Sequence, residues 1–549
     1  MANRMRLLRE FLMPNHRSAS LDFRIYDSRT AINRNRQSAL RFPEFVYMLS
    51  VPESSLISKR IQEPKPAEFW SNVKDCSKFG PNCAQYDSMT RTVVGGDDCL
   101  YLNVYTPSHE TSRSFTPKPV MVWIHGGLFA FGSGDDTLFG PDYIIENDVI
   151  LVTINYRLGV FGFLNLEDGE VSGNQGLKDQ LLALEWVQKN IENFGGDREN
   201  VTIFGESAGG ASVHYLTLSP LAKGLFHKAI SQSGVAVNPW AGMETSPKFY
   251  ARKLAQALGK EMTDSKILVE FLRSLDAKIL VEMDRKISQE VHWSAFRCFV
   301  PTVDETSKNP FLPISAKTAS HESVDVPFMM GHTSHEGIPW LTRATDDKKL
   351  ASYNSCLEQV FCPRATKLLE YQGLEVSDLK DIYFGNRPVS SESLCNYVEM
   401  QSDVQFLSGI HEVAAIQTIK NKCPTYFYKF SYDKGFSLVK ANAGLDISGA
   451  CHSDELNYIF YSKLLASMGI LPFKAGSMEH LVAKRVTEMW TNFAKTGNPT
   501  PAITNTLTVE WHPLKSPDNI ECLNINENLR MESIPNVYAK WEKKLTSKL

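Results

Sequence analysis

The sequence lacks any apolar run of the length that crosses a membrane, and it has no block of basic residues. A membrane helix needs about 20 consecutive apolar residues, whereas the longest apolar runs here, 120–124 and 149–154, have the length of buried strands. The chain carries 58 Lys and Arg against 62 Asp and Glu, a formal net charge of −4. We therefore expect neither a transmembrane segment nor a nucleic-acid partner.

Cysteine is also sparse, with 10 in 549 residues and no Cys-x-x-Cys pair. This density excludes a disulfide scaffold and gives no support for redox or zinc chemistry. His332 and His335 form an isolated His-x-x-His pair, so we expect no metal and no organic cofactor. Cys83 and Cys99 flank a short loop and are placed to form one bridge, whereas an intracellular location would favour free thiols.

No secretory signal is visible, because three arginines interrupt the first nine residues. The first 42 residues contain nine Arg and no Lys, together with acidic residues, which favours an irregular surface extension over a transit peptide. The chain ends in Ser547-Lys548-Leu549, the pattern of a peroxisomal address. We expect an intracellular, cytoplasmic protein, with the peroxisome as the alternative.

Strand-like and helix-like segments alternate over residues 92–240, and no repeat or Pro/Gly/Ser-rich linker divides the chain. A helical period over 174–191 predicts a helix, and helical stretches at 245–290 and 345–420 are expected to be excursions from a sheet. Runs of Val, Ile, Leu and Tyr predict strands at 98–107, 118–127, 148–157, 201–204, 228–234, 326–331 and 424–432. Continuous apolar strands alternating with helices predict one large α/β domain, with a mostly parallel sheet covered on both faces.

A Gly-Glu-Ser-Ala-Gly segment centred on Ser207 follows one of these strands, and a helix is predicted from Gly210 onward. A strand that turns sharply into a helix exposes its apex residue at the carboxyl end of the sheet, and flanking glycines let the backbones pass closely. The N-terminus of the following helix directs N–H groups toward a developing negative charge. The context favours Ser207 as a nucleophile over a serine in an ordinary turn.

A catalytic serine also needs hydrogen-bond donors for an oxyanion. Gly126 and Gly127 come at the end of a predicted strand, so their loop is placed to bring backbone N–H groups to Ser207. The Ala208 N–H would be a third donor. Taken alone, these two glycines also allow a glycine-rich loop that has no catalytic role, which is the less favoured interpretation.

The best candidate for the base is His452, which follows the strand at 424–432 and a polar loop. His411, by contrast, lies in a helical segment and is expected to be a helix-face residue. In this fold class the order along the chain is serine, acid, histidine, each in a loop at the carboxyl end of a strand. The order and position therefore favour His452.

For the acid, Glu336 stands just beyond the carboxyl end of the strand at 326–331, whereas Asp325 stands at its entrance. Only the carboxyl end of the strand lies on the same edge of the sheet as Ser207. Spacing alone leaves the acid the least determined of the three, and Glu336 is its best candidate.

Several segments of the chain resemble the type-B carboxylesterase/cholinesterase family, in particular its insect α-esterase type. The extended nucleophile signature of that family is matched by 194–210, and its second signature by 97–107. Further matches follow in family order, at 155–164, 173–187, 331–337 and 451–456. The resemblance covers roughly residues 61–545 and implies an α/β-hydrolase fold.

The resemblance implies a role for each candidate residue, with Ser207 as the nucleophile, Glu336 as the acid and His452 as the base. The other implied positions are Gly126, Gly127, Leu128 and Ala208 in the oxyanion hole, Trp240, Leu128 and Phe129 in the substrate pocket, Glu206 and Ser233 beside the triad, and Cys83 and Cys99 in a disulfide. The implied activity is hydrolysis of small carboxylic esters through an acyl-serine, without a cofactor.

The substrates implied by the resemblance are xenobiotic esters, or endogenous lipid, hormone or pheromone esters. Two alternatives stay open: a scavenger of esters or organophosphates that deacylates slowly, and a non-catalytic binding protein of the cholinesterase type.

Two features depart from the family pattern. Leu128 stands where the family has a third glycine, and a left-handed backbone there would cost about 1 kcal/mol or more. The early strands of the family are not recognisable in residues 1–60. We therefore treat 1–60 as a divergent N-terminal segment and 61–549 as the carboxylesterase domain.

Overall fold

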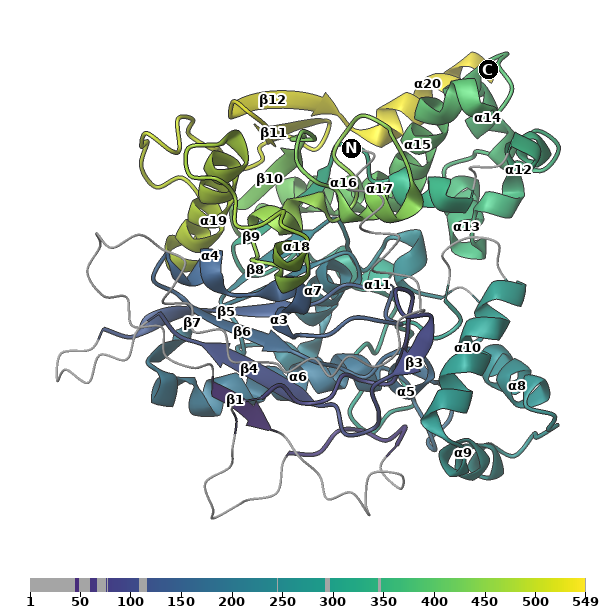
Figure 1. Cartoon of the computed structure of the whole chain (residues 1–549). Helices are drawn as coiled ribbons and strands as arrows, with labels where there is room; N and C mark the ends of the chain where they lie inside the picture. Colours follow the sequence, from purple (N-terminus) through teal and green to yellow (C-terminus); the bar gives the residue numbers. More distant parts are fainter. Residues whose placement is uncertain are drawn as a thin grey trace.

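The computed structural model describes residues 45–48, 60–66, 76, 78–107, 116–243, 245–291, 297–343 and 347–548. A ten-stranded sheet runs through its centre in the order β1-β4-β6-β5-β7-β8-β9-β10-β11-β12 (Figure 1). The strands are β1 Phe45–Met48, β4 Tyr101–Tyr105, β5 Lys118–Ile124, β6 Ile150–Ile154, β7 Gly196–Glu206, β8 Lys228–Gln232, β9 Phe328–Thr333, β10 Thr425–Phe430, β11 Asn519–Ile525 and β12 Arg530–Pro535. A separate hairpin pairs β2 Gln85–Asp87 with β3 Thr92–Val94.

The strands from β6 to β11 pair in parallel, while β1, β4 and β12 pair antiparallel at the two edges. The helices are α3 Asp136–Phe139, α4 Asp142–Ile145, α5 Gly159–Phe163, α6 Gln175–Asn190, α7 Ala208–Leu218, α8 Pro247–Ala257, α9 Ser265–Ser274, α10 Ala277–Val291, α11 Ala316–Ser320, α12 Asp347–Tyr353, α13 Pro363–Tyr371, α14 Val376–Phe384, α15 Leu394–Ser402, α16 Ser408–Lys420, α17 Leu438–Ala443, α18 Lys463–Ser467, α19 Met478–Thr496 and α20 Val537–Lys548. The predicted α/β-hydrolase fold, a mostly parallel sheet with helices on both faces, is confirmed.

The surroundings of strand β5 show why the sequences of the central strands are continuous apolar runs. Val120, Val122 and Ile124 are fully buried in the core cluster that α6 and α7 cover. Met121 and Trp123 are equally buried in a second cluster on the opposite face, where α19 packs. Because successive side chains of a strand point to opposite faces, a strand covered on both sides must be apolar at every position.

The structure corrects three expectations about secondary structure. The helix after the glycine-serine turn begins at Ala208, two residues earlier than predicted. Strands β11 and β12 and helix α19 were not predicted from the sequence. Residues 45–48 form an edge strand on β4, so the segment without a recognisable family pattern still contributes to the sheet. Most of residues 1–60 lie outside the described residues, and the domain boundary stays a prediction.

Cys83 and Cys99 form a disulfide, as the resemblance implied. The side chains of Ser547-Lys548-Leu549 lie outside the described residues, and the location stays a prediction.

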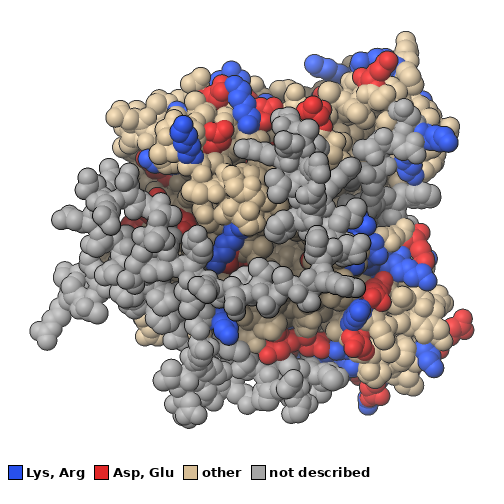
Figure 2. All heavy atoms as spheres, viewed as in Figure 1, with Lys and Arg blue, Asp and Glu red and all other residues tan. Residues whose placement is uncertain are grey.

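No helix in the described ranges combines the length and the apolar character needed to cross a membrane. On the face drawn in Figure 2, basic and acidic side chains occur together in the described part of the surface, in keeping with a net charge of −4.

Candidate active site

Ser207 lies in a sharp turn between β7 and α7. Its backbone angles, φ 58° and ψ −121°, cost a non-glycine residue about 1–3 kcal/mol. A Cβ on Gly209 would lie 2.0 Å from the Ile124 carbonyl oxygen, and a Cβ on Gly205 would lie 2.5 Å from the Gly209 carbonyl carbon. The two glycines of the motif are therefore required by close backbone packing, which holds Ser207 at the carboxyl end of the sheet.

The structure brings the three predicted triad residues together. Nε2 of His452 lies 2.9 Å from Oγ of Ser207, and Nδ1 of His452 lies 2.5 Å from Oε2 of Glu336. The other oxygen of Glu336 accepts hydrogen bonds from the Ser233 hydroxyl at 2.5 Å and from the Thr333 N–H at 2.7 Å. A hydroxyl, an imidazole and an anchored carboxylate in this order can move the serine proton to the imidazole.

Two loops at the same edge of the sheet carry the acid and the base. Glu336 comes three residues after the end of β9, and His452 comes in the loop after β10. The His335 N–H donates to the Ala450 carbonyl at 2.9 Å, and a parallel bridge joins His335 to Cys451. The two loops are thereby held side by side, and His335, which the sequence placed in an isolated His-x-x-His, has a backbone role here.

Neighbouring charges set the ionisation of the acid and the base. Burial would raise the pKa of Glu336, but the His452 charge and hydrogen bonds from His452, Ser233 and Thr333 lower it overall. Burial would lower the pKa of His452, but the negative charges of Glu206 and Glu336 raise it to about 9. The acid is therefore ionised at neutral pH, and it stabilises the protonated imidazole that forms when Ser207 loses its proton.

The loop after β5, residues 125–135, is called the oxyanion loop below and passes directly beside the nucleophile. A Cβ on Gly126 would lie 3.1 Å from the Cβ of Ser207. Gly127, Leu128 and Phe129 all have positive φ values, 108°, 55° and 58°. The backbone N–H groups of Gly127, Leu128 and Ala208 have no acceptor within the part of the chain that the structure describes. These N–H groups are available to bind an oxyanion.

Phe129 and Leu128, both predicted to line the substrate pocket, lie in different surroundings. The Phe129 side chain has 0% exposed surface and packs edge-on against Phe163, with ring centroids 5.2 Å apart. It supports the loop from the core, and its place in the substrate pocket stays a prediction. Leu128 is only half-buried, at the edge of the same core.

An aromatic cluster packs against the base. The Phe406 ring lies 4.8 Å from the His452 ring, 5.7 Å from Trp240 and 5.2 Å from Trp340, measured between ring centroids. A Cβ on Gly234 would lie 3.0 Å from Trp240 and 2.2 Å from the Ser207 carbonyl oxygen, so Trp240 lies beside the nucleophile turn. Of the three aromatic residues, only Trp240 was predicted.

Phe406 reaches this position because it lies on a π-helical turn, Asp403–Leu407, between α15 and α16. The Asn238 amide donates to two backbone carbonyls of this turn, those of Gln405 at 3.1 Å and Phe406 at 2.7 Å. Short π-helical insertions of this kind are frequent at functional sites. No local feature of the sequence marks such a turn, which is why Phe406 was missed.

Glu455 is a second functional-site residue that the sequence reasoning missed. It is fully buried and accepts a hydrogen bond from the Gln232 amide at 3.2 Å. Burial, with Glu206 and Glu336 close by, raises its pKa well above the usual range. The two buried acids therefore differ, because the surroundings of Glu455 raise its pKa and those of Glu336 lower it. Its only sequence signal was its place three residues after His452.

No group of three or more His, Cys, Asp or Glu side chains in the described residues is arranged to hold a metal ion.

The family model of the Carboxylesterase family matches residues 53–541. The chain belongs to the carboxylesterase family. It is 34% identical to the juvenile hormone esterase of Tribolium castaneum over 499 residues, which is 85% of this chain and 82% of that protein. It is 35% identical to esterase FE4 of Myzus persicae over 82% of this chain and 80% of that protein.

Among solved structures, the chain is similar to the juvenile hormone esterase from Manduca sexta. The two share a TM-score of 0.75 and 26% sequence identity, over 89% of this chain and 92% of that one. With the family assignment, this likeness identifies the chain as a carboxylic ester hydrolase on the α/β-hydrolase fold.

Glu206 gives this carboxylesterase a testable pH dependence. Its Oε1 lies 3.1 Å from Nε2 of His452 and accepts a hydrogen bond from Ser453 at 2.6 Å. A general base must be neutral, so a raised pKa of His452 moves the rising limb of activity to higher pH. We expect Glu206→Gln to shift the acidic limb of kcat/KM downward by about one pH unit. An unshifted limb in a pH profile of kcat/KM would show that Glu206 does not control this ionisation.

Proposed function

We propose that this carboxylesterase hydrolyses apolar carboxylic esters through an acyl intermediate on Ser207. The observation that carries the proposal is the unbroken chain of hydrogen bonds from Ser207 through His452 to Glu336, with unpaired N–H groups of the oxyanion loop beside it. Nucleophile, base, acid and oxyanion donors are the parts that acyl transfer requires.

In the proposed reaction, His452 removes the Ser207 proton while Oγ attacks the ester carbonyl carbon. Glu336 orients the imidazole and stabilises its charged form. The N–H groups of Gly127, Leu128 and Ala208 bind the tetrahedral oxyanion, each worth about 3–4 kcal/mol in comparable sites. His452 then protonates the leaving alcohol, and a water molecule that it activates releases the carboxylic acid and frees Ser207.

An apolar acyl group is favoured by the side chains around Ser207. Trp240, Phe406 and Trp340 form a largely buried aromatic cluster beside the triad, and aromatic side chains of this kind favour hydrocarbon over charged groups as neighbours. The names of the relatives, juvenile hormone esterase and bile salt-activated lipase, also describe enzymes that act on esters or lipids. We place the substrates of this chain in the same broad class.

The experiment is a series of p-nitrophenyl esters with acyl chains of two to eight carbons, followed by stopped-flow absorbance. We expect sustained turnover, with kcat/KM rising at least about tenfold from acetate to the best longer ester, since each buried CH₂ contributes about 0.8 kcal/mol. A kcat/KM that falls steadily with chain length would overturn the apolar substrate class. No release of nitrophenol at all would overturn the esterase proposal and favour a binding protein.

A second candidate function, slow-turnover scavenging, is favoured by Leu128. This residue has a positive φ of 55° at a position whose N–H faces the oxyanion, and a left-handed non-glycine backbone is strained by about 1–2 kcal/mol. In a scavenger, the same stopped-flow experiment would give one burst of product per Ser207 and then stop.

Leu128→Gly separates these two functions. The substitution removes the backbone strain and the half-buried side chain, so we expect kcat on short acyl esters to rise about two- to tenfold, which corresponds to about 0.4–1.4 kcal/mol of transition-state free energy. Phe131→Gly, on an exposed side chain of the same loop, is the matched control and is expected to give no such rise. Unchanged kinetic constants for Leu128→Gly would mean that Leu128 does not limit turnover.

A further inference from the structure

Gln85 forms hydrogen bonds to Gly132 near the end of the oxyanion loop, although the two residues are far apart in the sequence. Its side-chain oxygen accepts from the Gly132 N–H at 2.7 Å, and its side-chain nitrogen donates to the Gly132 carbonyl at 2.8 Å. The same nitrogen donates to the Cys83 carbonyl at 3.0 Å. The amide therefore satisfies both backbone groups of Gly132, as a neighbouring strand would, and is itself only 7% exposed.

Gly132 is the point where the oxyanion loop closes on itself. A Cβ on Gly132 would lie 2.3 Å from Nδ1 of His125 and 2.7 Å from the Gly126 carbonyl oxygen. Gly126 in turn packs against Ser207, and the Gly127 carbonyl accepts from the Phe131 N–H at 3.1 Å. A displacement of Gly132 is therefore passed on to Gly126 and Gly127, because no space between them can absorb it.

The disulfide loop, residues 83–99, holds the Gln85 side chain in place. The Cys83 carbonyl holds Gln85, and the Cys99 carbonyl accepts from the Asn155 amide at 3.1 Å. Asn155 in turn accepts from the Gly134 N–H at 2.7 Å. Both half-cystine carbonyls thus support amide side chains that hold the far end of the oxyanion loop.

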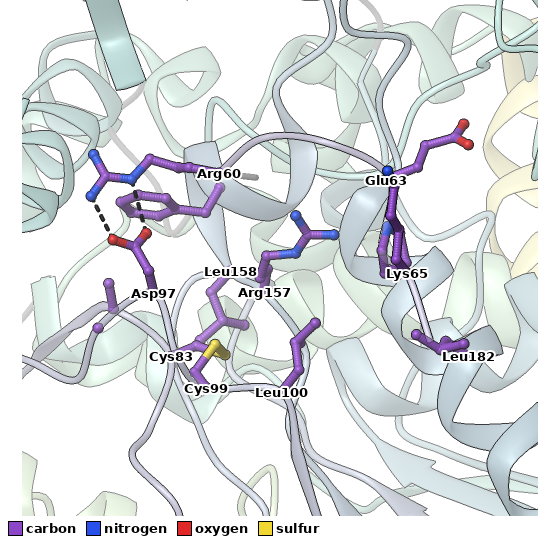
Figure 3. A pocket seen from close by; sticks show the side chains of 14 residues that line it. Arg60, Glu63, Lys65, Cys83, Asp97, Cys99, Leu100, Arg157, Leu158 and Leu182 are labelled. Carbon is purple, nitrogen blue, oxygen red and sulfur yellow. Dashed lines mark hydrogen bonds and ion pairs between the residues drawn. A yellow bond between two sulfur atoms is a disulfide. The ribbon is translucent and has the colours of Figure 1, made fainter. Parts of the chain in front are cut away.

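An ion pair fixes the disulfide loop from its other side. Arg60 pairs with Asp97 through two contacts of 2.9 and 2.5 Å, and Figure 3 shows this pair above the Cys83–Cys99 bridge, at a pocket also lined by Arg157 and Leu158. The side chain of Arg60 is 4% exposed. The disulfide and the ion pair together hold the disulfide loop in place, so the loop can support Gln85.

We propose that Gln85 is a positioning residue for ester hydrolysis, which holds the Gly127 and Leu128 N–H groups at the oxyanion through Gly132. This inference rests on the proposed function. We expect Gln85 to make no contact with the substrate, because it is buried and both polar atoms of its amide bind backbone groups. The hydrogen bonds of Gln85 are expected to stabilise the transition state, in which the N–H donors must lie within about 2.7–3.1 Å of the oxyanion.

The test is Gln85→Met, which keeps the side-chain volume and removes all three hydrogen bonds. Since misplacing reacting groups by about 1 Å costs up to about 100-fold, we expect kcat on p-nitrophenyl butyrate to fall about 10- to 100-fold, with KM changed less than about threefold. The affinity for a trifluoromethyl ketone, which forms a tetrahedral adduct on the serine, is expected to fall by the same factor as kcat. A change in KM alone, or kcat equal to wild type, would overturn the proposal.

Gln188→Met is the matched control. Gln188 also donates to two backbone carbonyls, those of Arg198 and Leu225, at 3.0 Å each, but on helix α6 away from the oxyanion loop. A merely structural role of Gln85 would give both variants the same small change in kcat and in the thermal midpoint. If Gln85→Met does not fold, Gln85→Glu replaces it, because this variant keeps the acceptor for the Gly132 N–H. It is expected to lose at least about fivefold in kcat at unchanged KM, and no loss would overturn the proposal.

The failure of this inference is distinguishable from the failure of the proposed function. Turnover by the wild type and by Gln188→Met tests the esterase activity itself. The positioning role fails only where these two proteins turn over and the Gln85 variants match them.

Discussion

Ser207→Ala is expected to lower kcat by about 10⁵- to 10⁶-fold on any ester that the wild type hydrolyses, because it removes the hydroxyl that attacks the carbonyl. The Ser207 hydroxyl is the group that lies 2.9 Å from the imidazole, and the strained turn holds it there. The oxyanion donors and the aromatic cluster around Phe406 stay in place, so KM is expected to change little.

Initial rates at micromolar enzyme, together with labelling by a fluorophosphonate and intact mass, measure this effect. The wild type is expected to gain one label, and the variant none. Ser212→Ala is the matched control, since this buried serine of helix α7 binds Gln180 at 3.1 Å and takes no part in the triad. Retention of more than a few per cent of activity by Ser207→Ala, with Ser212→Ala inactive, would refute the assignment of the nucleophile.

Glu336→Gln is expected to lower kcat by about 10⁴-fold, the second largest effect. An amide keeps the shape of the carboxyl group, but its N–H₂ donates where the carboxylate accepted. It therefore favours the imidazole tautomer that carries its proton on Nε2, which cannot take the proton of Ser207. The loss is expected in kcat, with the rate of fluorophosphonate labelling reduced in parallel.

Glu455→Gln provides the contrast, because it makes the same chemical change in another fully buried acid near His452. Burial and the nearby Glu206 and Glu336 raise its pKa, which favours the neutral form of the side chain, and an amide resembles that form. We expect kcat to stay within about threefold of wild type. Comparable losses in the two variants would mean that charge is not what distinguishes the two acids.

The nucleophile turn was predictable because its determinants are local. Gly205 is required by its close approach to Gly209 in the same turn, and both glycines also pack against Ile124 of the neighbouring strand, so a recognisable strand–turn–helix segment carries the signal. Glu336 and His452 were predictable from chain order, since each follows a recognisable strand. At these positions a recognisable backbone feature, a sharp turn or the end of a strand, occurs together with the residue type that catalysis needs.

The other residues of the site depend on contacts that sequence patterns do not encode. Phe406 meets His452 only because a π-helical turn rotates it there, and the turn is stabilised by Asn238, far away in the sequence. Gln85 is two residues after a cysteine, and nothing in that spacing predicts that its amide reaches Gly132. Phe129 was assigned to the substrate pocket from its place in the sequence, whereas its side chain is buried in the core, on a backbone with positive φ. Tertiary packing decides each of these cases.

The separation of the triad along the chain has a consequence for how the enzyme is made. Ser207 and His452 are 245 residues apart, and the strands that carry them pair only through β8 and β9. Long-range pairings of this kind form late in folding, because the entropy of closing the chain must be overcome first. During synthesis the serine emerges long before its base, so the nascent chain carries an inert hydroxyl. Esterase activity therefore reports that the strands from β7 to β10 have paired, and molecules in which they have not paired are expected to be inactive.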